Sequence, residues 1–443
     1  MTSLTQVADS IQSTLGPTAE RIARETGFVQ RQSKLSGARW VQTLVFGWQA
    51  SPAASLGQLT QTAATLGVSI TDQGLDARFT PAGAQCLEQV LQAALTQVIA
   101  ADPVSPPLLQ RFTAVCLLDS TQVQLPGELA ALWPGNGAYH VPAAQSAALK
   151  VQVGLEFRTG QLQGPFLQPG RAADRSSPTQ HTPVVAGALR MTDLGYFDLD
   201  TLQAWSAGQG FWLTRRMAGT CVYDAQGNPL HLNQFLRQQK GTSVECPVQL
   251  GQRHRLAARL FAIRVAPEVT ARRRRQLKEA ARVRQHPVSP ERWTLAGWTI
   301  YVTNVPPALL SLPEACVLMR MRWQMELLFK LWKQHGQLDT SRSHKPWRVL
   351  CEVYAKLLAL LMQHWLLLLG AWNHPDRSWV KAAQTIRQHA WHLAARMAQG
   401  RAAFSEALGV LQQCLTLGCR VNKRRKHPSA FQLCLDPSLQ TLT

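Results

Sequence analysis

Residues 113–120 read TAVCLLDS, a short apolar run that ends in Asp119 and Ser120. A second apolar segment, residues 183–193 (PVVAGALRMTD), ends in the same way at Asp193. Short apolar runs with polar ends are typical of buried strands. If the two runs are neighbouring strands, both carboxylates leave the sheet at one edge, where open α/β sheets place their sites. A single aspartate after a strand is more often a turn or cap residue, so the pair carries the argument.

The sequence around this pair changes character several times. Residues 149–157 (LKVQVGLEF) alternate like a strand and lead through a turn at Thr159 and Gly160 towards residues 161–167. Residues 208–305 contain more strand patterns around a basic stretch, residues 271–285 (ARRRRQLKEAARVRQ). Helical spacing dominates before residue 105 and after residue 312. The sequence therefore predicts a mixed α/β fold with helical regions at both ends.

Residues 313–334 predict a helix with two stripes. The apolar stripe recurs at steps of three and four residues and consists of Leu318, Met321, Met325, Leu328 and Trp332. The second stripe consists of Arg322, Glu326, Lys330 and Lys333. This row is either a solvent-exposed ladder of i,i+4 ion pairs or a carboxylate flanked by cations at a site. If Glu326 meets Asp119 and Asp193, three carboxylates converge, and such a cluster usually means bound divalent metal.

The charge balance points to a polyanionic partner. The 443 residues include 46 Lys and Arg against 26 Asp and Glu, a formal net charge of +20. A charge of that size destabilises the compact state by self-repulsion unless a polyanion neutralises it. A merely basic soluble protein is the alternative. Nucleic acid is favoured over a membrane because no basic amphipathic helix stands beside a lipid-type anchor.

Cysteine usage and apolar segments bear on location. The nine cysteines include no CxxC pair, so we expect neither a disulfide framework nor a structural zinc site, and we expect a cytoplasmic protein. The N-terminus has no basic stretch followed by an apolar core, so we expect no signal peptide. The most apolar segment, residues 349–372, is interrupted by Glu352, Lys356 and His364. It therefore predicts a buried helix rather than a membrane span.

Residues 59–79 (LTQTAATLGVSITDQGLDARF) have the pattern of a helix-turn-helix. The first helix is expected to end at Gly67, and Thr71 is expected to cap a second helix that contains Gln73, Asp76 and Arg78. Many plain helical hairpins have the same pattern. Specific DNA recognition and a structural hairpin are therefore both open for this segment.

Taken together, these motifs resemble the DDE transposases of bacterial insertion sequences. The nearest branch carries a Tyr-x2-Arg-x3-Glu-x6-Lys signature and excises its element through DNA hairpins. Arg322, Glu326 and Lys333, within RWQMELLFKLWK, match that signature. Asp119 in LLDSTQV and Asp193 in TDLGYF are similar to the first and second aspartate motifs of the family. The segment TNVP at 303–306 and the basic tail RRKHPSAFQL are also similar, so the resemblance covers most of the chain.

The resemblance implies a ribonuclease-H-like catalytic core with a strand-rich insertion. The implied segments are a helical DNA-binding domain at 1–105, the first part of the core at 106–207, the insertion at 208–305, the rest of the core with the Glu326 helix at 306–348, and a helical C-terminal region with a basic tail at 349–443.

The resemblance also implies the chemistry. Asp119, Asp193 and Glu326 would be the catalytic residues and would hold two Mg²⁺ ions, with Mn²⁺ as a substitute, because hard cations prefer oxygen ligands. Arg322 and Lys333 would bind phosphates of double-stranded DNA near the scissile bond. Lys330 either assists them or only pairs with Glu326.

Other DNA contacts are expected outside the carboxylates. A hairpin intermediate would strain the DNA end, so a flipped base is expected to stack on an aromatic ring. Trp298 is the candidate and Trp293 the reserve, with an ordinary core tryptophan as the alternative. Arg215, which follows a strand together with Arg216, would contact the backbone. The run 272–275 suits general DNA affinity or a solvated charge run.

One position departs from the signature. Its tyrosine falls at Met319, whose thioether cannot donate a hydrogen bond to phosphate. This puts the phosphate contact and the hairpin step in question. The rival functions are a catalytically inactive DNA-binding relative, which Met319 favours, and a nuclease without strand transfer. Paired-end chemistry implies a homodimer on DNA, and no membrane partner is expected.

Overall fold

The computed structural model describes residues 3–436, apart from 32–33, 105, 138–141, 375 and 422–429. The predicted basic tail at 422–427 lies outside these residues. The chain forms two compact units that interleave along the sequence. The first unit consists of Met1–Val104, Ser120–Ala172 and Met325–Lys423. The second unit consists of Ser105–Asp119, Ala173–Gln324 and Arg424–Thr443.

The strands follow the order β3-β2-β1-β4-β5-β9-β8-β7-β6. Strand β4 pairs in parallel with β1, and β5 pairs in parallel with β4. The three strands therefore run in the same direction. This order, with β4 and β5 parallel to β1, is that of a ribonuclease-H-like core, so the predicted fold class is confirmed. The strand bounds are β1 Val115–Leu125, β2 Ala147–Glu156, β3 Leu162–Pro169, β4 Leu189–Thr192, β5 Phe211–Arg215, β6 Val222–Tyr223, β7 Ser243–Leu250, β8 Leu256–Arg264 and β9 Trp298–Thr303.

Two strand predictions need correction. The first apolar run was expected to end at Asp119, but β1 continues to Leu125, so Asp119 lies inside the strand. The segment 183–191 was expected to be buried throughout, but only Leu189–Thr192 forms β4. The segment before β4 contains a proline, and Gly187 in it has a left-handed φ of 75°. It therefore runs as a loop until the chain reaches its partners on β1 and β5.

The second unit extends the sheet with antiparallel strands. The pairs β5–β9, β9–β8, β8–β7 and β7–β6 are all antiparallel, and a core of aromatic and aliphatic side chains that includes Trp212, Leu260 and Val302 packs on them. Asn304 ties β5 to the end of β9 because its amide accepts from the Trp212 backbone at 2.7 Å and donates to the Gly210 carbonyl at 2.9 Å. Asn304 of the TNVP segment at 303–306 therefore holds two strands of the sheet together.

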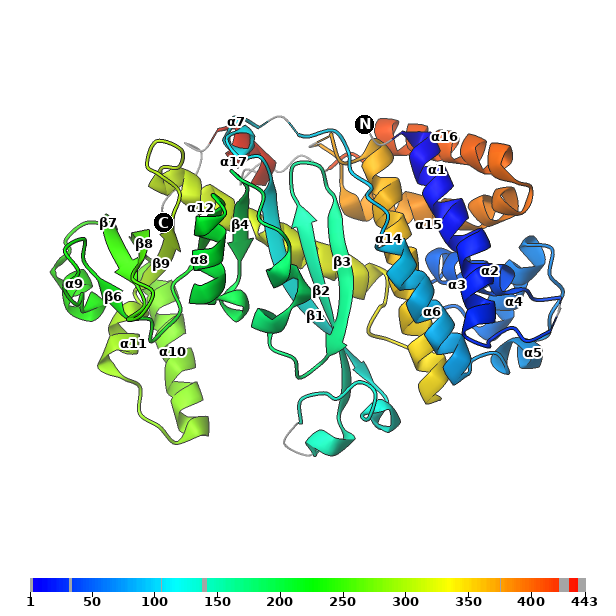
Figure 1. Cartoon of the computed structure of the whole chain (residues 1–443), viewed down its shortest axis with the longest axis horizontal. Coiled ribbons are helices and arrows are strands. Elements are labelled where there is room, and N and C mark those ends of the chain that lie inside the picture. The colour runs from blue at the N-terminus through cyan, green and yellow to red at the C-terminus, as the bar shows by residue number, and fades with distance from the viewer. Residues whose placement is uncertain are drawn as a thin grey trace. The chain divides into compact units, whose positions relative to one another are not determined.

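Most helices of the second unit connect these strands along the sequence. Their bounds are α7 Pro107–Gln110, α8 Leu199–Ala207, α9 Leu232–Gln238, α10 Pro267–Arg284, α11 Pro290–Leu295, α12 Leu312–Met321 and α17 Ala430–Leu435. The basic stretch of the sequence is thus a helix, α10, which Figure 1 shows beside α11. Short 3-10 turns connect the core strands: η4 Asp174–Ser176, η5 Pro178–His181 and η6 Leu194–Tyr196.

The first unit is a helical assembly built around α14. Its helices are α1 Leu4–Ser13, η1 Thr14–Thr18, α2 Ala19–Glu25, α3 Gly37–Ala50, α4 Leu56–Thr65, α5 Asp72–Asp76, α6 Pro81–Ala94, α14 Pro346–Gly370, α15 Trp379–Ala398 and α16 Arg401–Leu417, with the 3-10 turns η2 Gly127–Leu129 and η3 Ala143–Gln145. Helices α3 and α6 pack against α14 (Figure 1). These helices confirm the helical character predicted for both ends of the chain.

Helix α14 is long and apolar enough to cross a membrane, and no other helix of the described residues is. All of its most apolar window is buried inside the protein. Its polar residues Glu352, Lys356 and His364 are buried as well. The predicted buried helix at 349–372 is therefore confirmed.

The predicted helix-turn-helix is present in outline. Helix α4 ends before Gly67, whose φ is 81°, and the Thr71 hydroxyl caps α5 by accepting from the Gly74 N–H at 3.1 Å. Helix α5 is one turn long and ends at Asp76, so Arg78 lies outside it. Asp76 pairs with Lys345 at 2.6 Å and Arg348 at 3.3 Å. Residue Asp76 is thus used inside the unit, and DNA recognition by this hairpin stays a prediction.

The predicted helix at 313–334 consists of three successive segments. Helix α12 begins at a capping box of Ser311 and Glu314, and α13 (Trp323–Lys330) follows after a break at Arg322. A π-helical turn, η7 (Leu331–His335), completes it. All five members of the predicted apolar stripe are buried, at 0% or 1% exposure. The core-facing side of the helix is therefore confirmed.

Candidate functional site

Three neighbouring parallel strands place Asp119, Asp193 and Arg215 at one level of the sheet. Leu118 of β1 is in register with Thr192 of β4, and Thr192 is in register with Thr214 of β5. Each of the three candidate residues follows one of these paired positions directly. The Thr214 hydroxyl also donates to the Thr192 carbonyl at 3.2 Å, which fixes β5 against β4 just before the site. The sheet thus brings the two aspartates side by side, as their positions after two apolar runs predicted.

Asp119 has a cation beside it. The Arg322 guanidinium lies 3.4 Å from the Asp119 carboxylate, and the two side chains are only 15% and 18% exposed. Arg322 reaches this position from the break between α12 and α13. Neighbouring carboxylates with little access to water repel each other, and a guanidinium offsets part of that repulsion. The structure therefore places one predicted DNA-binding residue directly at a predicted catalytic one.

Asp193 stands at the start of a tightly held turn. It precedes η6 and makes no side-chain capping bond to it. The Gln180 amide donates to the Tyr196 carbonyl at the end of this turn, at 2.9 Å. Gly195 lies against Asp174, because a Cβ there would come within 2.6 Å of a carboxylate oxygen. A side chain at Gly195 would therefore displace the turn that holds Asp193.

Arg190, the second residue of β4, is a residue that the sequence reasoning missed. It is 2% exposed, and its guanidinium carbon lies 5.2 Å from the Trp205 ring centroid. Its guanidinium also reaches the Gln180 carbonyl at 3.5 Å. Burial lowers the pKa of Arg190 to about 10. The sequence could have indicated this residue, because Arg190 is a charged side chain inside the apolar run that ends at Asp193.

The first unit carries Glu326, Lys330 and Lys333. Glu326 is half-buried on α13 and Lys330 is exposed. Lys333 donates to the Gln122 carbonyl at 2.8 Å and lies 3.8 Å from the Asp339 carboxylate. Gln122 belongs to β1, the strand that carries Asp119. Lys333 thus contacts the part of β1 that belongs to the first unit.

Lys333 owes its direction to the π-helical turn η7. A π-helical turn holds more residues than an α-helical one, so it rotates the following side chains away from the α-helical row, and such turns are frequent at functional sites. The row of Arg322, Glu326, Lys330 and Lys333 expected for a regular helix is therefore interrupted before its last member.

The buried Lys356 and the half-buried Arg387 hold the end of η7 and the residues that follow it. Lys356 of α14 donates to the carbonyls of Gln337 at 2.8 Å and Thr340 at 2.9 Å, and it pairs with Glu352 at 2.7 Å. Gln337 has a left-handed φ of 47°, so the chain turns sharply there. Arg387 of α15 donates to the His335 carbonyl. These contacts fix the segment that follows Lys333.

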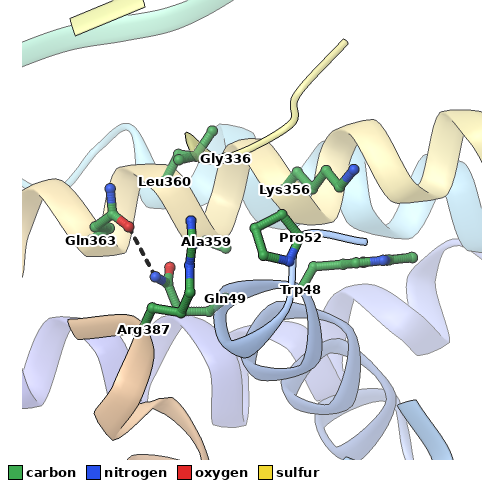
Figure 2. A pocket seen from close by; sticks show the side chains of 9 residues that line it. All are labelled: Trp48, Gln49, Pro52, Gly336, Lys356, Ala359, Leu360, Gln363 and Arg387. Carbon is green, nitrogen blue, oxygen red and sulfur yellow. Dashed lines mark hydrogen bonds between the residues drawn. The ribbon is translucent and has the colours of Figure 1, made fainter. Parts of the chain in front are cut away.

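Figure 2 shows the packing around this anchor. Lys356 and Gln363 extend from α14, and Arg387 and the α3 residue Gln49 approach from the other side. Gln49 donates to Gln363 at 2.9 Å. The cavity between them has a volume of about 10 Å³. Such a volume holds at most about one water molecule, so this region supports the fold and is too small for a substrate.

The described residues contain no group of three or more His, Cys, Asp or Glu side chains able to hold a metal ion. Asp119 and Asp193 supply two carboxylates at one level of the sheet. An oxygen-only donor set suits a hard divalent cation. Glu326 belongs to the first unit, and its joining of the two aspartates stays a prediction.

The aromatic candidates differ in exposure. Trp298 is 5% exposed and belongs to the core of the second unit, with the Arg264 guanidinium 4.4 Å from its ring centroid. The alternative of a core tryptophan therefore describes Trp298, which offers no open ring face for a base. Trp293 is half-buried, with Arg274 at 4.8 Å and Lys278 at 5.3 Å from the centroid. Met319, at the signature's tyrosine position, is 8% exposed.

The strand order and the parallel pairing of β1, β4 and β5 define the fold class as ribonuclease-H-like. A family model described as "Transposase DDE domain" matches residues 110–362, which is more than half of the chain. The chain therefore belongs to this family of DNA-cleaving and DNA-joining transposases.

Related transposases come from bacterial insertion sequences. The transposase of element IS231F from Bacillus thuringiensis subsp. israelensis is 28% identical over 364 residues, which cover 77% of this chain and 76% of the relative. The transposase of IS1151 from Clostridium perfringens is 22% identical over 363 residues, with coverage of 77% and 76%. A piggyBac transposase, solved as a synaptic complex with hairpin DNA, aligns over 97% of this chain and 87% of its own at 7% identity and a TM-score of 0.47.

Proposed function

We propose that the protein is a metal-dependent transposase that cuts DNA at the ends of its element and joins those ends to target DNA. Asp119, Asp193 and Glu326 are its proposed catalytic residues and the ligands of two Mg²⁺ ions, for which Mn²⁺ substitutes. The observation that supports this most is the register that sets Asp119 and Asp193 at one level of neighbouring parallel strands. Binding alone gains nothing from carboxylates that face a polyanion, because they repel phosphate unless a cation bridges them.

Each residue of the proposed site has a separate proposed role. Asp119, Asp193 and Glu326 would hold the ions, which when bound would favour activation of a water or 3′-hydroxyl and stabilise the leaving oxygen. Arg322, now 3.4 Å from Asp119, carries a planar guanidinium that binds phosphate through two hydrogen bonds. Lys333 of the first unit and the exposed Arg215 of the second are proposed point contacts to the DNA backbone. Lys330 is exposed and assists, or serves only as a helix-face partner of Glu326.

We place the chain in the branch with the Tyr-Arg-Glu-Lys signature and hairpin excision. Arg322, Glu326 and Lys333 occupy three of its four positions. Met319 occupies the fourth, and a buried thioether donates no hydrogen bond to phosphate. A hydroxyl or cation elsewhere must then supply this contact if a hairpin forms. Because Trp298 is buried in the core, Trp293 becomes the proposed stacking residue for a flipped base.

The first test is cleavage of duplex DNA that carries the natural flanks of the gene. With Mg²⁺ or Mn²⁺ we expect cuts at the element boundary. Asp193→Asn and Glu326→Gln keep the side-chain shapes and remove the charges, so cleavage should fall on the order of 10²-fold or more, the scale of losing one electrostatic group from an active site. Asp200→Asn is the matched control for Asp193→Asn, because Asp200 lies in the same unit as Asp193 and its side chain is 86% exposed.

The products separate the proposal from its rivals. Strand-transfer products support a transposase, whereas cleavage without them indicates a nuclease. Hairpin-ended fragments would show that the hairpin step tolerates Met319. If the natural protein binds the ends and cuts with neither metal, the chain is a DNA-binding relative without activity.

We also propose that two copies act together on paired ends. Joining two ends in one reaction needs two sites, and a closed homodimer supplies them at lowest cost in interfaces. Sedimentation with and without end DNA tests this. A complex that stays at one protein per duplex end at concentrations that support strand transfer would exclude it.

A further inference from the structure

The cations of helix α10 whose side chains the structure describes, six of the seven in its sequence, fall into two groups. The sequence of α10 contains seven basic residues and two acidic ones, Glu268 and Glu279. Arg273 donates to the Trp298 carbonyl at 2.9 Å and to the Thr299 hydroxyl at 3.0 Å, so it fastens the helix to β9. Arg274 and Lys278 lie against the Trp293 ring. These three cations therefore have partners within the unit.

The second group of α10 cations points to solvent instead of pairing within the unit. Arg272, Arg275 and Arg282 are exposed. Of the side chains of α10 that the structure describes, none takes part in an ion pair, although Glu279 lies on the same helix. Arginines at such positions commonly pair with acids three or four residues away. The exposed face of α10 thus carries positive charge that the protein itself leaves unneutralised.

These cations continue a line that begins at the aspartates. Arg215 follows Thr214 on β5, at the level of Asp193, and is in register with Tyr301 on β9. Burial lowers the pKa of the Arg273 guanidinium, and the nearby charges of Arg215 and Arg272 lower it further. Arg273 also bonds to Trp298 and Thr299 on β9, the strand that pairs with Arg215 through Tyr301. The positive surface therefore runs from β5 through Arg273 to α10 within one unit.

We propose that this surface, formed by Arg215, Arg272, Arg275 and Arg282, is a track for the backbone of the duplex that flanks the cleavage site. The proposal rests on the proposed function and adds the course of the DNA. From Arg272 to Arg282 the helix rises roughly 15 Å, a length over which duplex DNA carries roughly nine phosphate charges. Contacts from guanidinium groups without acid partners bind phosphate irrespective of base sequence.

The test measures binding of an unrelated 30-base-pair duplex as a function of salt. The triple variant Arg272→Gln, Arg275→Gln, Arg282→Gln keeps good helix formers and leaves Arg273 in place. Each lost phosphate contact should lower the slope of log K against log salt by about 0.9, so we expect a drop of roughly two to three. A melting curve confirms that the variant is folded.

A matched variant controls for net charge. Arg21→Gln, Arg396→Gln, Arg401→Gln removes the same three charges from helices α2, α15 and α16, where each arginine pairs with an acid. This control should change the slope by less than one. If both triple variants change the slope equally, or the α10 variant changes nothing, the track does not exist.

The result is independent of the cleavage test. Asp193→Asn should retain the natural salt slope on the unrelated duplex, because it removes no cation. If the natural protein does not cut DNA but the α10 variant shows a smaller salt slope, the catalytic proposal is wrong and the proposed DNA-binding surface on α10 stands.

Discussion

Helices α14 and α10 use charged side chains in opposite ways. Helix α14 runs for 25 residues through the core of the first unit, and its Lys356 and Glu352 side chains are 2% and 7% exposed and paired at 2.7 Å. Helix α10 runs for 18 residues on the second unit and holds exposed arginines with no ion pair. A buried cation must be neutralised by the protein, whereas an exposed one can remain available for an external anion. The burial of a charge, more than its presence in the sequence, therefore separates structural cations from candidate DNA contacts.

The strongest test of this difference removes one member of the buried pair. Lys356→Met leaves Glu352 buried without its cation and frees the carbonyls of Gln337 and Thr340. We expect a loss of about 3–5 kcal/mol in the free energy of unfolding, measured by urea denaturation. The matched change on the other helix, Arg275→Met, should stay within about 0.5 kcal/mol.

A double variant shows whether the uncompensated charge is the cause. Adding Glu352→Gln to Lys356→Met removes the buried charge and leaves an amide for the Ser341 hydroxyl, which now donates to Glu352 at 2.7 Å. The double variant should recover part of the lost stability. If it is as unstable as the sum of the single changes, the pair is not coupled and the comparison with α10 loses its basis.

Apolar truncation extends the comparison to packing. Leu358 of α14 is 0% exposed, and Leu358→Ala should cost about 2–5 kcal/mol because it leaves a cavity. Val283 of α10 is 80% exposed, and Val283→Ala should change stability by about 0.5 kcal/mol or less. The same urea titration measures both, and a costly Val283→Ala would mean that α10 is covered in solution.

The smallest expected effect concerns pH. His364 of α14 is buried, and its Nε2–H donates to the Gly160 carbonyl at 2.6 Å. Burial lowers its pKa to about 4, below the ordinary value of 6.5 for histidine. Between these values the unfolded chain binds the proton and the folded chain does not, so His364 costs stability as the pH falls from 6.5 towards 4.

The expected loss from His364 is at most roughly 3 kcal/mol across that window, from 1.36 kcal/mol per pKa unit. His364→Gln should flatten this part of the curve of unfolding free energy against pH, while carboxylates elsewhere keep their own slope. Equal slopes for the natural protein and the variant between pH 4.5 and 7 would contradict a neutral buried histidine.

Much of this arrangement could be predicted from local patterns. Two apolar runs ending in aspartates predicted neighbouring strands, and the stripe from Leu318 to Trp332 predicted the buried side of the helix that carries Glu326. These signals are local because a strand or helix must bury one side. The TDQG motif likewise predicted the Thr71 cap.

The failures have non-local causes. Strand β1 continues past Asp119 to Leu125, beyond its pairing with β4 and with β2 as its other neighbour in the sheet, which residue polarity does not reveal. The burial of Trp298 depends on packing against distant strands of its sheet. The π-helical turn at Lys333 and the anchoring by Lys356 and Arg387 join segments whose proximity no spacing rule encodes.

The interleaving of the two units has a consequence for synthesis. Helix α3 buries Trp40, Val41 and Leu44 in the unit whose central helix is α14, yet α14 follows about 300 residues later in the chain. At ~5–20 residues per second, a ribosome delivers α14 on the order of 15–60 s after α3. During that interval the apolar side of α3 lacks its final partner. Fragments released before α14 is made should therefore be targets for chaperones and proteases, so that only a nearly complete chain becomes a stable protein.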